Sequence, residues 1–284
     1  MIPQDNRIPP TFSLNLRGRL FSFEQPLIMG IVNATPDSFY ADSRVSGIAA
    51  SLLRAEALLE QGANLLDVGG VSTRPGSEMV TVEEELDRVI PVVEAIHSRF
   101  PEAVLSVDTF RPEVARQAVH AGALMVNDIS GGRWYPNMLT TVAELQVPYI
   151  MMHSTGSWNE LHKVPENRRV VEEVYDYFTA GIAACREAGI HDLILDPGIG
   201  FGKTVEENFQ LLKHFYLFTQ LGKPVLLGVS RKSMIYKTLG NSPAEALNGT
   251  SVLHTAGLLQ GAMLLRVHDP AAAKEAIQLT RLLQ

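Results

Sequence analysis

Polar and charged residues follow short apolar runs at regular intervals along this chain of 284 residues. Their types suit one kind of ligand. Carboxylates and amides can bond a heterocycle with several N–H groups, while arginine binds phosphate oxygens through two parallel hydrogen bonds. We therefore expect a site for a small ligand with a polar ring and an anionic group. The residues concerned are Asn33, Asp67, Thr73, Arg74, Asp108, Asn127, Asp128, His153, Asp196, Ser230, Arg231, Lys232, Arg266 and His268.

The cations gather after the last two apolar runs. Arg231 and Lys232 follow the seventh run, and Arg266 and His268 belong to the eighth. The loops after the last two strands of an α/β barrel usually bind phosphate. An anionic group of the ligand is therefore expected here, with arginine forming paired hydrogen bonds and lysine adding a point charge.

Three polar side chains end the third, fourth and sixth runs: Asp108, Asn127 and Asp196. All three should point into a fairly dry mouth, where an unpaired charge is costly. A heterocycle that donates N–H groups would satisfy them. Two loop segments, 35–44 and 72–76, carry turn residues and could close over a bound ligand.

Some of these residues are open to other chemistry. Lys232 could form a Schiff base, as the lysine of a barrel aldolase does, although the adjacent serine and arginine suit an ion-binding role better. His153 and His268 could bind a metal, but neither has a second histidine or a carboxylate triad at the spacing of a zinc site. A Mg²⁺ ion shared between an oxygen ligand and a substrate phosphate is compatible with these residue types.

The apolar runs themselves predict the elements that carry this site. They are nearly continuous, which is typical of parallel strands covered on both faces. Helical periodicity separates them, as in the stripe from Val82 through Val89 to Ile96. Eight strand–helix units favour a (β/α)8 TIM barrel; an open doubly wound sheet is the alternative, but no glycine-rich dinucleotide fingerprint follows the first run. The runs are 27–32, 64–68, 103–107, 123–127, 147–152, 193–195, 225–229 and 263–267.

Local signals mark several boundaries. Capping-box spacing predicts helix starts at the pairs Thr81 and Glu84, Thr204 and Glu207, and Ser242 and Glu245, and Asp269 before Pro270 predicts another N-cap. Residues 12–16 and 20–23 flank Arg17-Gly18 and predict a β-hairpin that plugs the N-terminal end of the barrel. We expect one domain over residues 1–284, with 1–25 as its hairpin extension.

Composition narrows the partners. The net charge of −7 disfavours nucleic acid, which usually requires a basic face. The first residues lack the basic start and apolar run of a signal peptide, and no stretch of about 18 apolar residues predicts a membrane span. A cytoplasmic enzyme with small-molecule substrates is expected. The single cysteine, Cys185, is interpreted as a packing residue.

An ordered set of motifs resembles the signatures of the dihydropteroate synthase family. Each motif alone is weak, but together they run in family order from about residue 26 to the C-terminus. They are Asn33-Ala-Thr-Pro-Asp-Ser-Phe39, Asp67-Val-Gly-Gly70 with Ser72-Thr-Arg-Pro-Gly76, Ser106-Val-Asp-Thr109, Asn127-Asp128, Asp196-Pro-Gly198 with Gly200-Phe-Gly-Lys203, Ser230-Arg-Lys-Ser233 and Arg266-Val-His-Asp269.

The resemblance implies a reaction in folate biosynthesis that sulfonamides block. 6-Hydroxymethyl-7,8-dihydropterin pyrophosphate condenses with p-aminobenzoate to give 7,8-dihydropteroate and pyrophosphate, with Mg²⁺ assisting. It also implies a dissociative mechanism in which pyrophosphate departs before the aniline nitrogen attacks, and a homodimer.

The resemblance further implies the residue roles. The pterin would contact Asp108, Asn127, Asp196 and Lys232, and the pyrophosphate would contact Asn33, Arg266, His268 and Mg²⁺, with Asn33 as the metal ligand. The p-aminobenzoate would lie near Phe39, Thr73, Pro75, Phe201, Ser230 and Arg231. The catalytic residues implied are Asp108, Lys232, Asp196 and Arg74.

Three positions depart from the family pattern. Val71 replaces a usual glutamate, Ser154 replaces a methionine expected near the pterin, and the first loop reads Phe39-Tyr-Ala-Asp42. Two other functions therefore remain alternatives. A methyltetrahydrofolate-dependent methyltransferase shares the pterin-binding barrel, but it needs no cationic pyrophosphate site. A pterin-binding paralogue without synthase activity would bind pterin but would not capture p-aminobenzoate.

Overall fold

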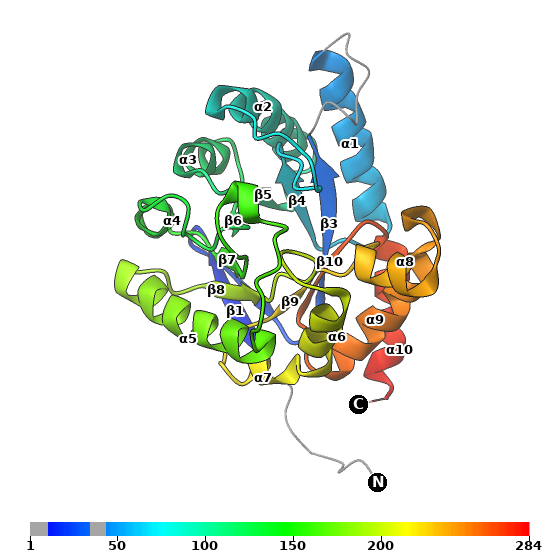
Figure 1. Cartoon of the computed structure of the whole chain (residues 1–284). Helices are drawn as coiled ribbons and strands as arrows, with labels where there is room; N and C mark the ends of the chain where they lie inside the picture. Colours follow the sequence, from blue (N-terminus) through cyan, green and yellow to red (C-terminus); the bar gives the residue numbers. More distant parts are fainter. Residues whose placement is uncertain (1–10, 35–43, 284) are drawn as a thin grey trace.

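The computed structural model describes residues 11–34 and 44–283, in which helices surround a ring of parallel strands (Figure 1). The strands of the ring are β3 (Leu27–Asn33), β4 (Leu65–Gly69), β5 (Val104–Asp108), β6 (Met125–Asp128), β7 (Tyr149–Met152), β8 (Leu193–Asp196), β9 (Leu226–Leu227) and β10 (Leu264–Val267). All eight match the predicted runs.

Helices follow the strands and cover the outside of the ring. They are α1 (Arg44–Glu60), α2 (Val82–Arg99), α3 (Pro112–His120), α4 (Met138–Leu145), α5 (Val170–Ala188), α6 (Val205–Lys213), α7 (Tyr216–Thr219), α8 (Ser233–Leu239), α9 (Leu247–Leu259) and α10 (Pro270–Arg281), with 3₁₀ turns at Trp158–Glu160 and Pro243–Glu245. No helix in the described part of the chain is long and apolar enough to cross a membrane.

The strands close into a barrel. Their order is β8-β7-β6-β5-β4-β3-β10-β9, every neighbouring pair is parallel, and a parallel bridge between Leu195 and Val225 joins the two ends. At this junction the Leu195 N–H donates to the Pro224 carbonyl at 3.0 Å. The TIM-barrel prediction is therefore confirmed, and the open doubly wound sheet is excluded.

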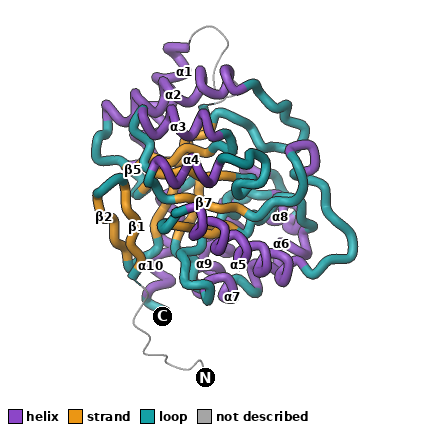
Figure 2. Tube along the Cα trace, turned by 90° about the vertical axis from the view of Figure 1, so that its left-hand side faces the viewer, coloured by secondary structure: helices purple, strands orange, loops and turns teal. Residues whose placement is uncertain are grey.

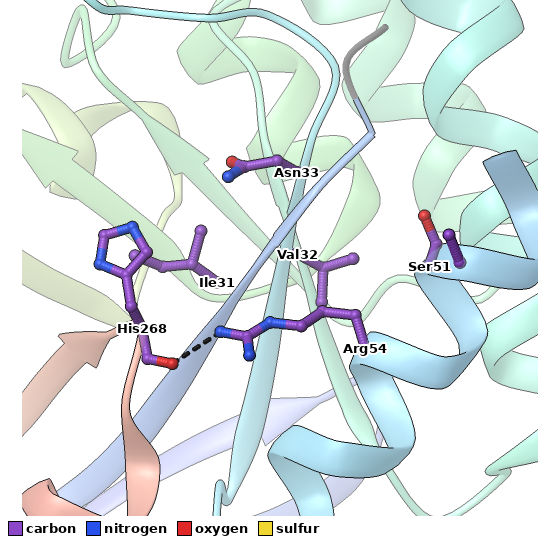
Figure 3. Close-up of a pocket in the computed structure, with 7 residues that line it drawn as sticks. Ile31, Val32, Asn33, Ser51, Arg54 and His268 are labelled. Atoms are coloured by element: carbon purple, nitrogen blue, oxygen red, sulfur yellow. Dashed lines mark hydrogen bonds between the residues drawn. The ribbon is translucent and has the colours of Figure 1, made fainter. Parts of the chain in front are cut away.

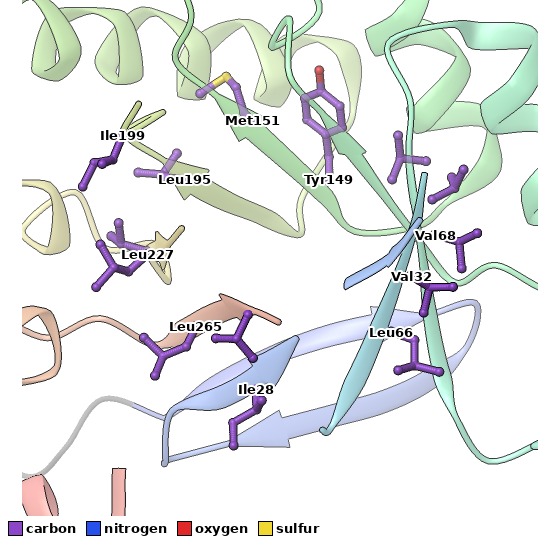
Figure 4. Close-up of a cluster of buried hydrophobic side chains, with 14 of the residues drawn as sticks. Ile28, Val32, Leu66, Val68, Tyr149, Met151, Leu195, Ile199, Leu227 and Leu265 are labelled. Carbon is purple, nitrogen blue, oxygen red and sulfur yellow. The ribbon is translucent and has the colours of Figure 1, made fainter. Parts of the chain in front are cut away.

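Strand side chains alternate between two cores. Those pointing outward, such as Ile28, Val32, Leu66 and Leu265, pack against the helices in the larger core (Figure 4). Those pointing inward fill the N-terminal half of the barrel, where they meet the hairpin. This period of two is the geometry of a strand, and it decides which residues can reach the ligand site.

The hairpin of β1 (Phe12–Leu16) and β2 (Arg19–Phe23) lies beside one end of the barrel (Figure 2). Leu14, Leu16 and Phe23 are buried together with the first inward-pointing residues of the barrel strands, so the predicted plug is confirmed. Its turn places Arg17 and Gly18 at positive φ, 53° and 93°, the conformation of a two-residue hairpin loop.

The predicted capping boxes are all present. Those at Thr81 and Thr204 begin α2 and α6, whereas the one at Ser242 begins only a 3₁₀ turn. Asp269 lies at the N-cap position of α10, but its side chain caps nothing. The predicted N-cap position is therefore confirmed, but the Asp269 carboxylate pairs with Arg231 instead of a backbone N–H, because a charged partner binds it more strongly.

Candidate active site

The C-terminal ends of β4, β5, β6 and β10 bring four polar side chains into one network. Arg266 Nε donates to Asp67 Oδ2 at 2.7 Å, and its Nη2 donates to Asp108 Oδ2 at 2.6 Å. The Asn127 amide donates to the same Asp67 oxygen at 2.9 Å. The Asp67 side chain is fully buried, whereas those of Asp108 and Arg266 are each 23% exposed. The network thus has one buried carboxylate, Asp67, and two groups that are open to the barrel mouth, Asp108 and Arg266.

Strand register sets this arrangement. Asp108 pairs with Gly69 on one side and with Asn127 on the other. A Cβ atom at Gly69 would lie 3.2 Å from Asp108 Cβ, closer than side chains normally pack. Glycine at the end of β4 therefore leaves the room that the Asp108 side chain occupies.

Burial dominates the electrostatics of the network. It raises the pKa of Asp108 to about 7; Arg266 opposes this rise, and Asp67 adds to it. Burial alone would lower the pKa of Arg266, but the charges of Asp67 and Asp108 outweigh it and raise that pKa. Arg266 therefore stays cationic, while Asp108 changes charge near neutral pH.

Asp196 and Lys232 approach each other across the next part of the mouth. A Cβ at Gly228 would lie 3.6 Å from Lys232 Nζ and 4.0 Å from Asp196 Oδ2. Lys232 Nζ donates to the Ile199 carbonyl and lies 4.5 Å from the centre of the Phe201 ring. Burial raises the pKa of Asp196, with Lys232 opposing, and lowers the pKa of Lys232 to about 8.

Ser230 and His268 form a second polar pair at the ends of β9 and β10. The Ser230 hydroxyl lies 3.0 Å from His268 Nδ1 and accepts from the His268 backbone N–H at 3.1 Å. Burial lowers the pKa of His268 to about 4, and the nearby Arg266 adds to this shift. The ring is therefore neutral at physiological pH, and its Nε2 atom forms no hydrogen bond with the described residues.

Arg231 is engaged within the protein. Its guanidinium forms two hydrogen bonds with the Asp269 carboxylate, at 2.8 and 3.0 Å, and donates to the Pro243 and Ala244 carbonyls. The Asp269 carboxylate raises the pKa of Arg231. Arg231 thus ties the loop after β9 to the start of α10, away from the network around Arg266.

The loop after β4 carries three of the predicted residues. Arg74 and Pro75 are exposed and Thr73 is half-buried. The Thr73 carbonyl lies 2.8 Å from His162 Nε2, and the His162 ring stacks on Phe201 with centroids 5.9 Å apart. The loop is therefore linked to the Phe201 side of the mouth. Phe39 and most of the first loop lie outside the described residues.

Two predicted polar residues support the site from outside it. Asp128 accepts from the Ser130 and Gly132 N–H groups and from the Tyr149 hydroxyl, all within the β6–α4 turn and β7. His153 lies 3.2 Å from Glu173 and is buried. Both residues therefore hold loops in place, as strand-end polar residues often do.

The departures from the family pattern also have places in the structure. Val71 packs against a small buried cluster of Phe110, Ile129, Met152 and Leu161, which Trp134 and Trp158 also cover. Ser154 is fully buried, and its carbonyl and hydroxyl accept from Arg133. Ser154 thus connects the loops after β6 and β7.

Two charged residues beside the site, Lys203 and Arg111, were given no role from the sequence, although Lys203 belongs to one of the family motifs. Lys203 is buried, donates to the carbonyls of Gly198 and Phe201 at 2.9 and 3.0 Å, and has its pKa lowered by burial to about 7. Arg111 pairs with the buried Glu85 at 2.6 Å and binds the carbonyls at the end of the 72–81 loop. Neither residue directly follows an apolar run, so position after a strand did not single it out. The partner of Arg111 is also distant in sequence, because Glu85 lies 26 residues earlier.

A pocket of about 280 Å³ lies beside the mouth, between α1, β3 and β10 (Figure 3). Asn33 and His268, two of the predicted site residues, line it. Arg54 and Ser51 of α1 also line it, and both were missed. Their helical spacing of three residues was the available signal, since it places them on one face of α1.

No group of three or more His, Cys, Asp or Glu side chains in the described part of the chain is arranged to hold a metal ion. Asn33 supplies one amide oxygen at an exposed strand end. A single oxygen suits Mg²⁺, which usually keeps its waters and binds through one or two protein oxygens together with substrate phosphates.

Comparison with known proteins places the chain in a family. A family model described as pterin binding enzyme matches residues 29–268. The dihydropteroate synthase of Escherichia coli (strain K12) is 42% identical over 264 residues, covering 92% of this chain and 93% of that protein.

Solved structures agree. The Xanthomonas albilineans dihydropteroate synthase with 4-aminobenzoic acid is 43% identical, with a TM-score of 0.90 over 97% of this chain and 99% of that chain. The same organism's enzyme in complex with 7,8-dihydropteroate is 41% identical, with a TM-score of 0.86 over 96% of this chain and 98% of that chain. The chain therefore belongs to the dihydropteroate synthase family of pterin-binding enzymes.

Proposed function

We propose that the chain condenses 6-hydroxymethyl-7,8-dihydropterin pyrophosphate with p-aminobenzoate, giving 7,8-dihydropteroate and pyrophosphate, at the polar end of the barrel. The observation that carries this proposal is the network in which Arg266 joins Asp67 and Asp108 while Asn127 shares the same Asp67 oxygen. It offers a flat, polar surface of carboxylate, amide and guanidinium groups, which matches the donors and acceptors of a pterin ring.

The pterin would lie between two sides of the mouth. Asp108 and Asn127 would accept and donate on one side, and Asp196 and Lys232 would do so on the other. Convergence of the latter two at Gly228 supports this placement, because no side chain fills the space there. In such a partly desolvated mouth each hydrogen bond to the ring gains strength and discriminates against ligands that lack its partner.

The mechanism proposed is dissociative. Pyrophosphate leaves from the pterin methylene carbon, and the electron-rich dihydropterin spreads the positive charge that remains. The Asp108 carboxylate stabilises this cation electrostatically. The aniline nitrogen of p-aminobenzoate then attacks the same carbon and loses a proton, so positioning matters more than a strong base.

Neutral and cationic side chains would receive the pyrophosphate. Arg266 remains charged, His268 can donate from its free Nε2 edge, and Arg74 lies on an exposed loop able to approach the ligand. Asn33 would hold Mg²⁺ together with the diphosphate oxygens, and the ion would supply positive charge to the leaving group.

The p-aminobenzoate would lie near Thr73, Pro75, Phe201 and Ser230. The contact from the Thr73 carbonyl to His162, and the stack of His162 on Phe201, support a shared wall for its ring. Arg231 supports this wall from behind through its pair with Asp269, which holds the loop that carries Ser230.

The direct test mixes the protein, Mg²⁺, both substrates and buffer and follows dihydropteroate by mass spectrometry. The wild type should form product, and a sulfonamide should compete with p-aminobenzoate. Asp108→Asn should reduce the rate about 100- to 1000-fold, the usual effect of removing one preorganised electrostatic group. Pterin binding without product in the wild type would contradict synthase activity.

We also propose a homodimer that acts in the cytoplasm. Val252 and Leu259 of α9 and Leu279 of α10 are exposed apolar side chains on adjacent helices, which supports a covered face there. Sedimentation equilibrium should give twice the chain mass of 31.1 kDa, and Leu279→Asp should shift the population toward the monomer.

A further inference from the structure

The pocket between α1, β3 and β10 differs in charge from the rest of the mouth. Its lining residues are Ile31, Val32, Asn33, Ala50, Ser51, Arg54 and His268. Among these described residues there is one guanidinium and no carboxylate. Figure 3 shows Arg54 extending from α1 along the pocket toward His268, with Asn33 on the opposite side.

Arg54 differs from Arg266 and Arg231, the arginines that follow the last two strands of the barrel. Arg266 is bonded to two carboxylates and Arg231 to one. Arg54 donates to the His268 carbonyl at 2.6 Å and forms no ion pair with a carboxylate of the described residues. Because one carbonyl uses only part of a guanidinium with five donors, several N–H groups stay available. Asp269 acts on Arg54 only through its charge, which opposes the lowering of the Arg54 pKa by burial.

Ser51 supplies a second, independent observation. Its side chain is 2% exposed and its hydroxyl has no hydrogen-bond partner among the described residues. A buried hydroxyl without a partner is unfavourable, so a ligand oxygen that accepts its hydrogen bond would relieve the cost. It lies one helical turn before Arg54, on the same lining of the pocket.

We propose that Arg54 and Ser51 form, with Asn33 and His268, an oxyanion subsite that takes the terminal phosphate of the diphosphate group. This inference rests on the proposed function and adds two residues of α1 to it. Arg54 supplies a fork of N–H donors with a full charge, Ser51 a hydroxyl donor, Asn33 an amide and His268 an Nε2–H. Such a donor set without acids matches a phosphate and disfavours a neutral ligand.

In the proposed subsite, a side chain of α1 contacts the leaving diphosphate group. Charge builds on the diphosphate as its bond to the methylene carbon breaks, and Arg54 would meet that charge from outside the ring of strands. Its bond to the His268 carbonyl also fixes the end of β10, so the two partners of the phosphate are positioned together. Arg54 would contact the leaving group but not the pterin ring.

Direct binding measurements test the subsite without turnover. Isothermal titration would give the affinities of inorganic pyrophosphate with Mg²⁺, of orthophosphate, and of 6-hydroxymethyl-7,8-dihydropterin, which lacks the diphosphate. Arg54→Gln should weaken pyrophosphate binding about tenfold or more, the loss of roughly 1.4 kcal/mol. Ser51→Ala should weaken it about threefold, and neither variant should change the affinity for the pterin alcohol.

Two matched variants control for the fold. Arg99→Gln removes an arginine on α2 whose side chain is 65% exposed and should leave every affinity unchanged. Arg54→Lys keeps the charge and should recover part of the pyrophosphate affinity. Melting temperatures recorded beside the titrations identify any variant that fails to fold.

Three outcomes would overturn the subsite. They are an unchanged pyrophosphate affinity in folded Arg54→Gln, an equal loss of affinity for the pterin alcohol, and orthophosphate binding as tight as pyrophosphate binding. Failure of the proposed function has a different signature. A wild type that forms no dihydropteroate, yet binds pyrophosphate through Arg54, would refute the synthase reaction and retain the subsite.

Discussion

The two ends of the barrel are built from the same strands but have opposite chemistry. On four strands, an inward-pointing apolar residue is followed two positions later by an inward-pointing polar residue. The pairs are Leu65 and Asp67, Met125 and Asn127, Ile194 and Asp196, and Leu264 and Arg266. The apolar member of each pair packs with the hairpin, and the polar member reaches the mouth.

This change from apolar to polar residues indicates that stability and function depend on neighbouring layers of one barrel. The N-terminal layer gains its free energy from burial of apolar surface, which needs no particular partner. The C-terminal layer contains buried charges, each of which needs its own partner. A substitution in the lower layer should therefore affect stability, and one in the upper layer should affect activity.

Among the variants that compare the two layers, the largest effect should come from breaking the upper network at its buried carboxylate, Asp67. Asp67→Asn removes the charge that Arg266 and Asn127 share, so Arg266 loses one of its two anchors. The rate of dihydropteroate formation should fall about 100-fold, in line with the cost of a misplaced electrostatic group. Stopped assays at saturating substrates measure the change.

The matched control for that variant is Asp192→Asn, at the opposite end of β8 from Asp196. Its side chain is half-buried and forms no hydrogen bond or ion pair with the residues that the structure describes. Its activity should stay within about twofold of the wild type, because surface substitutions usually change stability by less than about 0.5 kcal/mol. Equal losses in both variants would contradict the division between layers.

The second effect should appear in stability alone. Leu16→Ala removes a side chain that is 2% exposed at the centre of the plug and should lower the free energy of unfolding by about 2–5 kcal/mol. Activity of the folded fraction at 25 °C should be little changed. Leu20→Ala, in the same hairpin but 71% exposed, is the control and should unfold like the wild type. Urea unfolding checks both.

A third, smaller effect should appear in the pH dependence of pterin binding. The pKa of Asp108 is about 7, so its carboxylate predominates only above that pH. If the ionised form binds, affinity should rise about tenfold between about pH 6 and pH 8, following the ionised fraction. Asp108→Asn should abolish this dependence. Equal slopes in the two proteins would show that another group is responsible.

The smallest effect should be a difference between the two layers in how the free energy of unfolding changes with pH. The folded protein binds a proton on His268 only near pH 4, whereas the unfolded chain binds it near 6.5. Between these values the unfolded state holds more protons, so the free energy of unfolding falls as the pH falls. His268→Asn should reduce that slope by up to about 1 kcal/mol per pH unit.

The lower layer should not share this behaviour. Leu16→Ala should cost the same free energy of unfolding at pH 5 as at pH 7, because its neighbours in the plug are apolar. Urea unfolding at the two pH values measures both variants. A pH-dependent cost at Leu16 would indicate that acid loosens the whole barrel together.

Much of the fold was predictable because its signals are local. Apolar runs gave the strands, and capping pairs gave the helix starts at Thr81 and Thr204, since each depends on residues three or four positions apart. The plug followed from two apolar strands around a turn. Polar residues at strand ends predicted the network of Asp108, Asn127 and Arg266, because barrel closure brings strand ends together.

The remainder depends on pairs distant in sequence. Whether Arg231 is free or paired depends on Asp269, 38 residues later. Arg54 reaches the mouth only because α1 packs beside β10, and its partner His268 is 214 residues away. Residue type and spacing cannot specify which of several carboxylates an arginine will meet. Such partners are set by the packing of helices on the barrel.

The ring of strands closes through few backbone contacts between β8 and β9, and this junction is called the seam. β9 contributes only two residues, and a single bridge between Leu195 and Val225 joins it to β8. Where few backbone hydrogen bonds cross, local opening takes the least free energy. Asp196 ends the strand on one side of the seam, and Lys232 follows the strand on the other.

A pterin that forms hydrogen bonds with both Asp196 and Lys232 would link the two strands across this seam. Substrate would then serve as part of the scaffold, and binding would slow amide hydrogen exchange at Leu195 more than at the centre of β4. Substrate binding would therefore stabilise the closure of the barrel between β8 and β9.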